Sequence, residues 1–184
     1  VCAMYEKLGV DSVKLFNGMF AYVIYDRRKN IMVGARDRLG KKPFYFWHEG
    51  KEFEFASQPN VIKYGYNLHV DATARQFYLL QGIISDPYSP FAEVKKLRAG
   101  ECFTFNLSSG KLDIQTYWDV DTNSCGFTAP KSYDEAKQMV KDLLFDAVRL
   151  RLNANVPVGT FLSGGIDSSL ICAIVSKFNK DLCA

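Results

Sequence analysis

Residues that commonly build metal centres and disulfide frameworks are scarce in this sequence. It has five cysteines and two histidines among 184 residues. The cysteines are odd in number and widely spaced, and no two of them form a CxxC pair. This pattern argues against a zinc site and against a secreted disulfide framework, and it favours reduced thiols in a cytoplasmic protein.

Long apolar runs and a large excess of one charge are also missing. No run approaches the roughly 20 apolar residues that a membrane span needs, and Glu6 and Lys7 come too early for a signal peptide. The 23 basic and 20 acidic residues leave a net charge of +3, which indicates no particular polyanionic partner. We therefore expect small-molecule partners, and neither nucleic acid nor a membrane.

Both ends of the sequence suggest a piece of a longer protein. The chain begins at Val1 inside a helix-like stretch, VCAMYEKLG, for which Gly9 is the expected stop. It stops at Ala184, shortly after another helical stretch.

Three pairs of stretches rich in β-branched and aromatic residues predict three antiparallel hairpins, because a short polar turn joins the two members of each pair. In chain order they are 19–26 with 31–36, 43–47 with 52–56, and 101–107 with 112–118. Short helices are expected near 59–64 and after Asp71, which is a good N-cap residue. The first 120 residues should therefore be mostly strands.

The character of the chain changes after residue 120. Residues 121–132 are polar, contain Gly126 and Pro130, and read as a linker. Ser132 and Glu135 have the spacing of a capping box. An amphipathic helix should follow, with its apolar stripe formed by Ala136, Met139, Val140, Leu143, Leu144, Ala147 and Val148.

The last third of the chain predicts one strand–turn–helix unit. VPVGTFL (156–162) has the composition of a buried strand, SGGIDSS (163–169) that of a glycine-rich turn, and LICAIVSKF (170–178) that of an apolar helix. This order is typical of an α/β domain with a parallel sheet.

The SGGIDSS turn carries the clearest chemistry. Its two glycines permit positive φ and a close approach of the backbone to a ligand, its serines supply hydroxyl donors, and the following helix directs its N-terminal amides at the same place. A phosphate suits such a site, and Asp167 suggests a Mg²⁺ ion between carboxylate and phosphate. The alternative is a turn that merely caps a helix. Neither a GxxxxGK[ST] loop nor a GxGxxG fingerprint is present.

The loop resembles the SGGxDS signature of the PP-loop ATP pyrophosphatases, which cleave ATP between its α and β phosphates. Upstream, four stretches resemble the second half of a class II glutamine amidotransferase domain: FNGMFAYVIYD (16–26), ARDRLGKKPFYF (35–46), FASQPNVI (55–62) and RAGECF (98–103). In this order, and followed by SGGIDSS, they are similar to the glutamine-hydrolysing asparagine synthetases over nearly the whole chain.

The resemblance implies a fold that is α+β and then α/β. Residues 1–120 would be part of an N-terminal-nucleophile-type αββα glutaminase sandwich, residues 121–132 a linker, and residues 133–184 the first strand–loop–helix of a PP-loop domain.

The resemblance also implies an activity, the ATP-dependent amidation of aspartate to asparagine through a β-aspartyl-adenylate. Aspartate, glutamine and ATP would be the substrates with Mg²⁺ as the metal, and a homodimer is a possible assembly. Residues expected to bind ATP or pyrophosphate are Leu162, Ser163, Gly164, Gly165, Asp167, Ser168 and Ser169, with Asp167 also placing Mg²⁺. Two alternatives stay open: a related two-domain enzyme that activates another carboxylate, and a catalytically silent remnant.

The glutaminase nucleophile of that family is an N-terminal cysteine whose free α-amino group acts as the base. Cys2 follows Val1 and therefore lacks a free α-amino group. We expect Cys2 to be a buried core thiol, the nucleophile to lie upstream, and no catalytic residue to be present in this chain.

The basic loop formed by Arg36, Arg38, Lys41 and Lys42 is the remaining candidate. A solvated turn is the favoured interpretation, and an interdomain face or ligand path is the alternative. Asp37 should form local ion pairs with its two arginine neighbours.

The histidines and one aromatic strand are given structural roles. Neither His48 nor His69 has a neighbouring constellation that suggests catalysis. Four aromatic residues are expected in the core rather than on a base-stacking surface: Phe44, Tyr45, Phe46 and Trp47.

Overall fold

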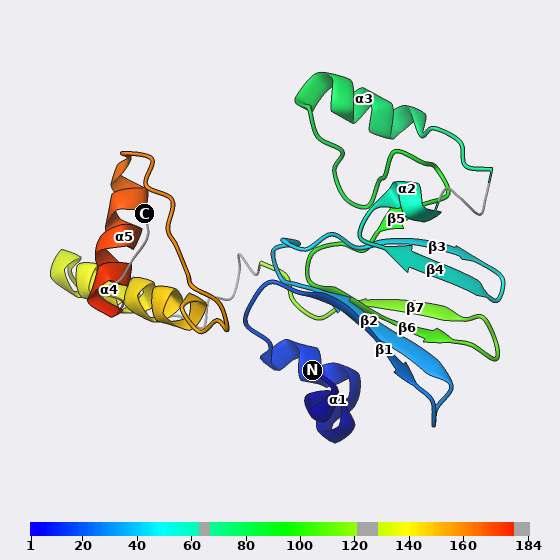
Figure 1. The fold of residues 1–184 in the computed structure, drawn as a ribbon, viewed down its shortest axis with the longest axis horizontal. Coiled ribbons are helices and arrows are strands. Elements are labelled where there is room, and N and C mark those ends of the chain that lie inside the picture. The colour runs from blue at the N-terminus through cyan, green and yellow to red at the C-terminus, as the bar shows by residue number, and fades with distance from the viewer. Residues whose placement is uncertain (63–66, 121–128, 179–184) are drawn as a thin grey trace. The chain divides into compact units, whose positions relative to one another are not determined.

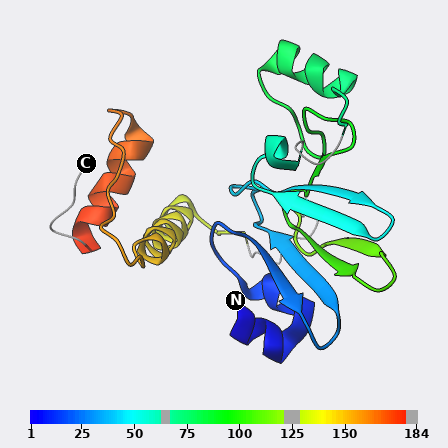
Figure 2. The ribbon, with the colours of Figure 1, turned by 45° about the vertical axis from the view of Figure 1, so that its right-hand side comes forward.

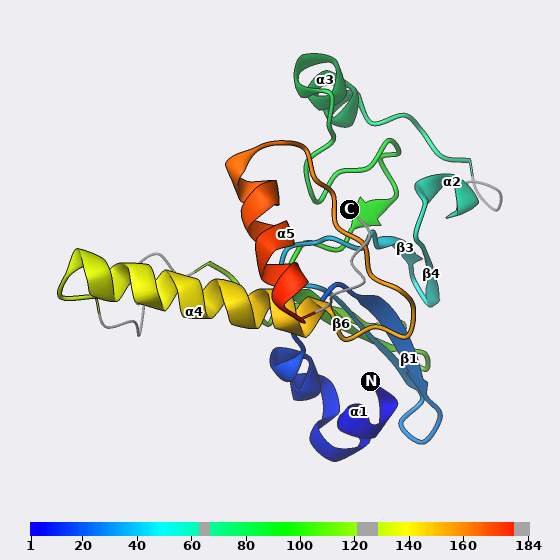
Figure 3. The same ribbon diagram turned by 60° about the vertical axis from the view of Figure 1, so that its left-hand side comes forward.

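A computed structural model describes residues 1–62, 67–120 and 129–178. The chain divides into two compact units, Val1–Val120 and Asp121–Ala184, which Figures 1, 2 and 3 show from different sides. The predicted linker, 121–132, lies mostly outside the described residues. Among the helices that are described, none combines the length and apolar character needed to cross a membrane.

Unit 1 contains two antiparallel sheets. The larger sheet has the strand order β1-β2-β6-β7, and the smaller has the order β4-β3-β5. The larger sheet is formed by β1 (Ala21–Asp26), β2 (Ile31–Arg36), β6 (Glu101–Asn106) and β7 (Leu112–Thr116). The smaller is formed by β3 (Tyr45–Glu49), β4 (Glu52–Ala56) and the short β5 (Lys95–Lys96).

All three predicted hairpins are therefore present, with strand ends within about two residues of those expected from the turn signals. The antiparallel sheets confirm a mixed α and β architecture.

Phenylalanine rings fill the space between the two sheets. Phe103 of the larger sheet lies 5.1 Å from Phe53 of the smaller one, and Phe53 stacks on Phe105 at 5.0 Å between ring centroids. Phe44, which is 4% exposed, completes this layer at 5.5 Å from Phe103. The alternation of acidic and aromatic residues along β4 thus turns one face of the strand toward the core.

Helices cover the outer face of each sheet. The helix α1 (Cys2–Leu8) and the 3₁₀ helix η1 (Gly9–Leu15) lie on the larger sheet, where Val13 packs against Ala35 and Cys102. On the smaller sheet Ile62, from α2 (Pro59–Ile62), packs with Trp47 and Val94. Figure 1 shows the resulting order of helix, sheet, sheet and helix.

Helix α3 (Ala72–Gln81) follows in the same unit and begins where the sequence predicts. The side chain of Asp71 accepts a hydrogen bond from the Ala74 amide, and Gly82 ends the helix in the left-handed conformation. Gly9 ends α1 with a φ of +64° and a ψ of −146°, which differs from the left-handed helical conformation of Gly82.

The expectation for Cys2 is wrong, because its side chain is exposed. Cys2 occupies the first position of α1, and the one residue that this helix buries is Tyr5. The Tyr5 hydroxyl donates to Asp26 at 2.9 Å, so the helix is held to the sheet through its middle turn and not through Cys2.

Where the structure describes it, unit 2 contains two packed helices, α4 (Tyr133–Arg151) and α5 (Ile166–Phe178). Ser132 caps α4 by accepting from the Glu135 amide at 3.2 Å, but the Glu135 carboxylate accepts from the Lys131 amide, so only half of the capping box forms. The helices meet at Val148, Ile174 and Val175. Other members of the predicted apolar stripe are exposed, including Val140 at 56% and Leu143 at 62%.

The predicted strand over 156–162 is not formed. Apart from a single bridge residue, Gly159, these residues have no regular secondary structure, and Val156 and Phe161 are 69% and 98% exposed. A buried strand needs neighbouring strands to accept and donate its backbone hydrogen bonds, and the described residues of unit 2 form no such strand.

Replacing Gly34 by alanine should destabilise unit 1. A Cβ atom there would clash with the Phe103 ring and lie 2.7 Å from the Tyr22 carbonyl oxygen. Because β2 is a central strand, overpacking should lower the free energy of unfolding by about 1–3 kcal/mol, measured by urea denaturation. Gly18→Ala is the control, because nothing lies within 4 Å of its Cβ position. An equal effect of both variants would contradict this account of the core.

Candidate functional site

The SGGIDSS segment lies at the start of α5 (Figure 3). The helix begins at Ile166, four residues earlier than the sequence predicts. Asp167, Ser168 and Ser169 therefore belong to its first turn and do not precede it. The first N–H groups of an α-helix have no acceptor within the helix, so these residues surround a set of backbone donors.

The side chain of Ser168 holds the loop in its folded form. Its hydroxyl accepts from the Ser163 amide at 3.3 Å and donates to the Gly165 carbonyl at 3.1 Å. It also lies 3.0 Å from the Ser163 hydroxyl. One serine on the helix thus ties the beginning of the loop to the first helical turn and brings two hydroxyl groups together.

The two glycines have different conformations. Gly164 has a φ of +83°, a value that side-chain-bearing residues rarely adopt, whereas Gly165 does not have a positive φ. The expectation that both positions use this freedom is therefore met at Gly164 alone. No atom lies within 4 Å of the Cβ position of Gly164, so this side of the loop is open.

The loop can bind an anion with its hydroxyls and helix N-terminal amides. Asp167 supplies a carboxylate in the same turn, but the described residues include no group of three or more metal-ligating side chains. A Mg²⁺ ion at Asp167 would therefore take its remaining ligands from phosphate oxygens and water, which is the usual way that Mg²⁺ is bound beside a nucleotide. The residues present fit that arrangement.

A neighbouring contact escaped sequence reasoning. The Thr160 hydroxyl lies 3.0 Å from the Cys172 sulfur, and this contact joins residues 156–162, which precede the loop, to the second turn of α5. The signal in the sequence that could have indicated this contact is Thr160, a small polar residue inside the apolar stretch 156–162. Leu162, next to the loop, is 55% exposed.

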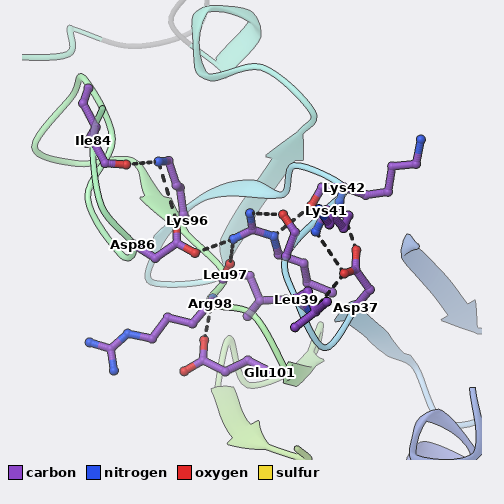
Figure 4. A network of polar contacts seen from close by, with 12 residues as sticks. Asp37, Leu39, Lys41, Lys42, Ile84, Asp86, Lys96, Leu97, Arg98 and Glu101 are labelled. Carbon is purple, nitrogen blue, oxygen red and sulfur yellow. Dashed lines mark hydrogen bonds and ion pairs between the residues drawn. The ribbon is translucent and has the colours of Figure 1, made fainter. Parts of the chain in front are cut away.

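In unit 1 the interpretation of the basic loop as a solvated turn is wrong for Arg36, and Asp37 inside the loop is buried as well. Arg36 is 8% exposed and Asp37 is 1% exposed. Figure 4 shows Asp37 within a network of polar contacts, to which the Arg36 guanidinium also belongs. Lys41 and Lys42 are exposed, and Arg38 is half-buried with its guanidinium donating to the Lys14 carbonyl at 3.1 Å.

Asp37 does not form the expected ion pairs with its arginine neighbours. Its carboxylate accepts from the amides of Leu39, Lys41 and Lys42 at 3.2, 2.9 and 2.9 Å, and from the amide of Phe20 at 3.3 Å. The loop folds around the carboxylate, as aspartate favours in turns. Burial by itself raises the pKa of Asp37, but these backbone N–H groups outweigh it, and the pKa lies below its ordinary value.

Arg36 is satisfied in a different way. Its Nε donates to the Lys42 carbonyl at 2.8 Å and its Nη2 to the Gly40 carbonyl at 2.8 Å. Its Nη1 donates to the Asp86 carboxylate at 2.7 Å and to the Leu97 carbonyl at 2.6 Å. The guanidinium therefore connects the end of β2 to the loop that follows it and to a segment about 50 residues away.

The histidines and the aromatic strand lie in ordinary structural surroundings. His48 Nε2 is 2.9 Å from the Gly110 carbonyl oxygen, and His69 pairs with Glu93 at 2.8 Å. Phe44 and Trp47 are 4% and 6% exposed and belong to the core.

Two families match the chain in succession. Residues 1–118 match the glutamine amidotransferase domain, and residues 139–183 match asparagine synthase. A glutamine-hydrolysing asparagine synthetase of Methanocaldococcus jannaschii is 36% identical over 182 residues, which cover 97% of this chain and 35% of that protein.

Two further relatives show the range of names. Asparagine synthetase 3 of Bacillus subtilis is 37% identical over 179 residues, covering 93% of this chain and 28% of the relative. Amidase chry2 of Gibberella zeae is 31% identical over 181 residues, covering 98% of this chain and 26% of the relative. The chain thus spans between a quarter and about a third of the length of these relatives.

Asp37→Asn should destabilise unit 1 most at neutral pH. Because the pKa of Asp37 is lowered in the folded state, its contribution is present above the unfolded pKa of about 4 and is lost as the pH falls through the lower, folded value. We expect the free energy of unfolding of the variant to be about 2 kcal/mol lower than that of the wild type at pH 7. This difference between variant and wild type should shrink below about pH 4. Asp113→Asn, at an exposed position of β7, is the control. A difference that is independent of pH would contradict the role assigned to the carboxylate.

Proposed function

Since this chain belongs to the glutamine amidotransferase domain family, we propose that it is part of a glutamine-hydrolysing asparagine synthetase. Residues 1–120 would contribute to the glutaminase domain, and residues 133–184 would begin the ATP-dependent synthetase domain. The order of the two family matches along the chain supports this assignment. The helix–sheet–sheet–helix layering of unit 1 supports an N-terminal-nucleophile-type sandwich.

The whole protein would amidate aspartate with ammonia released from glutamine. Activation of the aspartate carboxylate by ATP, through a β-aspartyl-adenylate, would release pyrophosphate before ammonia attacks. The SGGIDSS loop at the start of α5 is the observation that carries this proposal. It combines open backbone donors with paired hydroxyls in one turn, which suits the binding of phosphate groups.

Each loop residue has a proposed role in holding the phosphates of ATP. The serine hydroxyls and the helix amides would donate to phosphate oxygens, and Gly164 would provide the backbone conformation that directs them. Leu162 would face the nucleotide with its backbone. A Mg²⁺ ion bound beside Asp167 would neutralise part of the phosphate charge. The phosphate-binding set is Leu162, Ser163, Gly164, Gly165, Asp167, Ser168 and Ser169.

The glutaminase nucleophile is proposed to be a residue other than Cys2. The Cys2 thiol is exposed on α1, and its backbone nitrogen is bound to Val1 in a peptide bond. It therefore has no free α-amino group to serve as the base.

A second candidate function is the amidation of a carboxylate other than that of aspartate. Its support is that a relative similar over 98% of this chain is named an amidase and not an asparagine synthetase. The two candidates share the phosphate loop and differ in the carboxylate that stimulates pyrophosphate release.

Ser168→Ala should reduce ATP-dependent synthesis by the whole enzyme, because the variant loses the hydroxyl that folds the loop and donates to phosphate. Loss of such preorganised donors lowers the rate on the order of 10²-fold. Pyrophosphate and glutamate release are measured separately, with aspartate and with other amino-acid carboxylates as acceptors. Glutamate release should persist in the variant.

Ser176→Ala is the matched control. It removes a serine near the other end of the same helix, where the hydroxyl donates to the Ala173 carbonyl at 2.9 Å. Undiminished pyrophosphate release in Ser168→Ala would show that the loop is a helix cap and would refute its nucleotide-binding role. Stimulation by another carboxylate in place of aspartate would favour the second candidate.

A further inference from the structure

Residues 71–90, here called the excursion, leave unit 1 and return to it at one place, where hydrogen bonds join the two ends. We call this place the neck. The Asp71 amide donates to the Pro90 carbonyl at 3.0 Å, and the Ala92 amide donates to the His69 carbonyl at 2.9 Å. Helix α3 lies within the excursion, and Figure 1 shows it standing away from the sheets.

The excursion has little apolar contact with the rest of the unit. Ala74 is the one residue of α3 that is buried, whereas Tyr78, Leu79 and Leu80 are 60%, 71% and 82% exposed. The ring contact of Phe77, at 5.5 Å, is with Tyr88 of the same excursion. Segments with few buried apolar contacts are those that open locally while the remaining structure stays folded.

Asp86 is where the excursion reaches a buried charge of the core (Figure 4). Its carboxylate lies 2.7 Å from Arg36 Nη1 and 3.6 Å from Lys96 Nζ. The Arg36 side chain is 10% exposed and that of Asp86 is 29% exposed. One partner of the pair therefore belongs to the core, and the other retains access to water.

The consequences of breaking this pair differ on its two sides. Without Asp86, Arg36 keeps three carbonyl acceptors, from Gly40, Lys42 and Leu97, so its charge remains hydrogen-bonded inside the core. The Asp86 carboxylate can be hydrated where it is exposed. The excursion, in contrast, loses both ion pairs with the core. It keeps its neck, the contacts around Ala74, and two hydrogen bonds from Lys96, one from its amide to the Pro87 carbonyl at 2.9 Å and one from its Nζ to the Ile84 carbonyl.

We propose that Asp86 is a latch that controls how often residues 71–90 open away from the sheets. In the closed state its carboxylate bridges Arg36 and Lys96. In the open state the Asp86 ion pairs and the hydrogen bonds from Lys96 to the Pro87 and Ile84 carbonyls are broken. The neck stays paired, Arg36 keeps its carbonyl acceptors, and the strands of the two sheets stay paired with one another. This inference does not depend on the reaction that the enzyme catalyses.

Hydrogen–deuterium exchange of the full-length protein tests the latch. Asp86→Asn keeps the shape of the side chain and removes its charge. We expect peptides from α3 to exchange at least about ten-fold faster than in the wild type, with no change in peptides from β2 and β6. Glu93→Gln is the matched control, because it alters the exposed pair of Glu93 with His69 at the neck and leaves Asp86 untouched.

Lys96→Met is a second variant, in which the Arg36 pair remains. It loses both the ion pair with Asp86 and the hydrogen bond from Lys96 Nζ to the Ile84 carbonyl, so the same α3 peptides should exchange faster than in the wild type. Unchanged exchange of α3 in Asp86→Asn would overturn the proposal. Equal acceleration in β2 and β6, or failure of the variant to fold, would also overturn it, because Asp86 would then be a structural strut of the core and not a latch.

Discussion

Two adjacent buried charges at the end of β2 are the constraint on which unit 1 depends. Arg36 and Asp37 have opposite signs, yet each is satisfied mainly by backbone groups: the arginine by carbonyls and the aspartate by amides. A buried charge without such partners would be costly. The loop after β2 must therefore close around the carboxylate, and the backbone at Leu97 must pass beside the guanidinium, which fixes where the strands of the two sheets begin and end.

The hydrogen bonds of Arg36 and Asp37, which form a polar junction at the end of β2, and the apolar core contribute to the fold in different ways. The phenylalanine layer around Phe53 and Phe103 supplies the burial that holds the sheets face to face, but rings of similar size would tolerate several packings. The hydrogen bonds of Arg36 are directional and reach β2, the following loop and the segment near Leu97. Together they select one arrangement of the sheets, and Asp86 attaches the α3 excursion to the same junction.

In unit 2 the organisation of the candidate phosphate loop comes from the start of α5. The side chain of Ser168 in the first helical turn fastens Ser163, and Gly164 adopts the backbone conformation that lets the chain turn into the helix. A loop built in this way has its donors arranged before a ligand arrives, which reduces the cost of ordering them on binding. Asp167 shares that turn and is the carboxylate available to a metal ion there.

Local signals in the sequence determined the hairpins, the Asp71 cap of α3, the glycine stop of α1 and the presence of the SGGIDSS loop, because each depends on residues close together in the chain. Tertiary structure decided whether the side chains of Arg36, Asp37 and Cys2 are buried or exposed. An arginine beside an aspartate in a basic turn predicts solvent exposure. Burial of this arginine becomes favourable because the fold brings acceptors to it, including the Leu97 carbonyl, 61 residues away. The absence of a strand over 156–162 has the same origin. The composition of this segment is that of a strand, but a strand needs a neighbouring strand to accept its hydrogen bonds, and the part of unit 2 that the structure describes contains none.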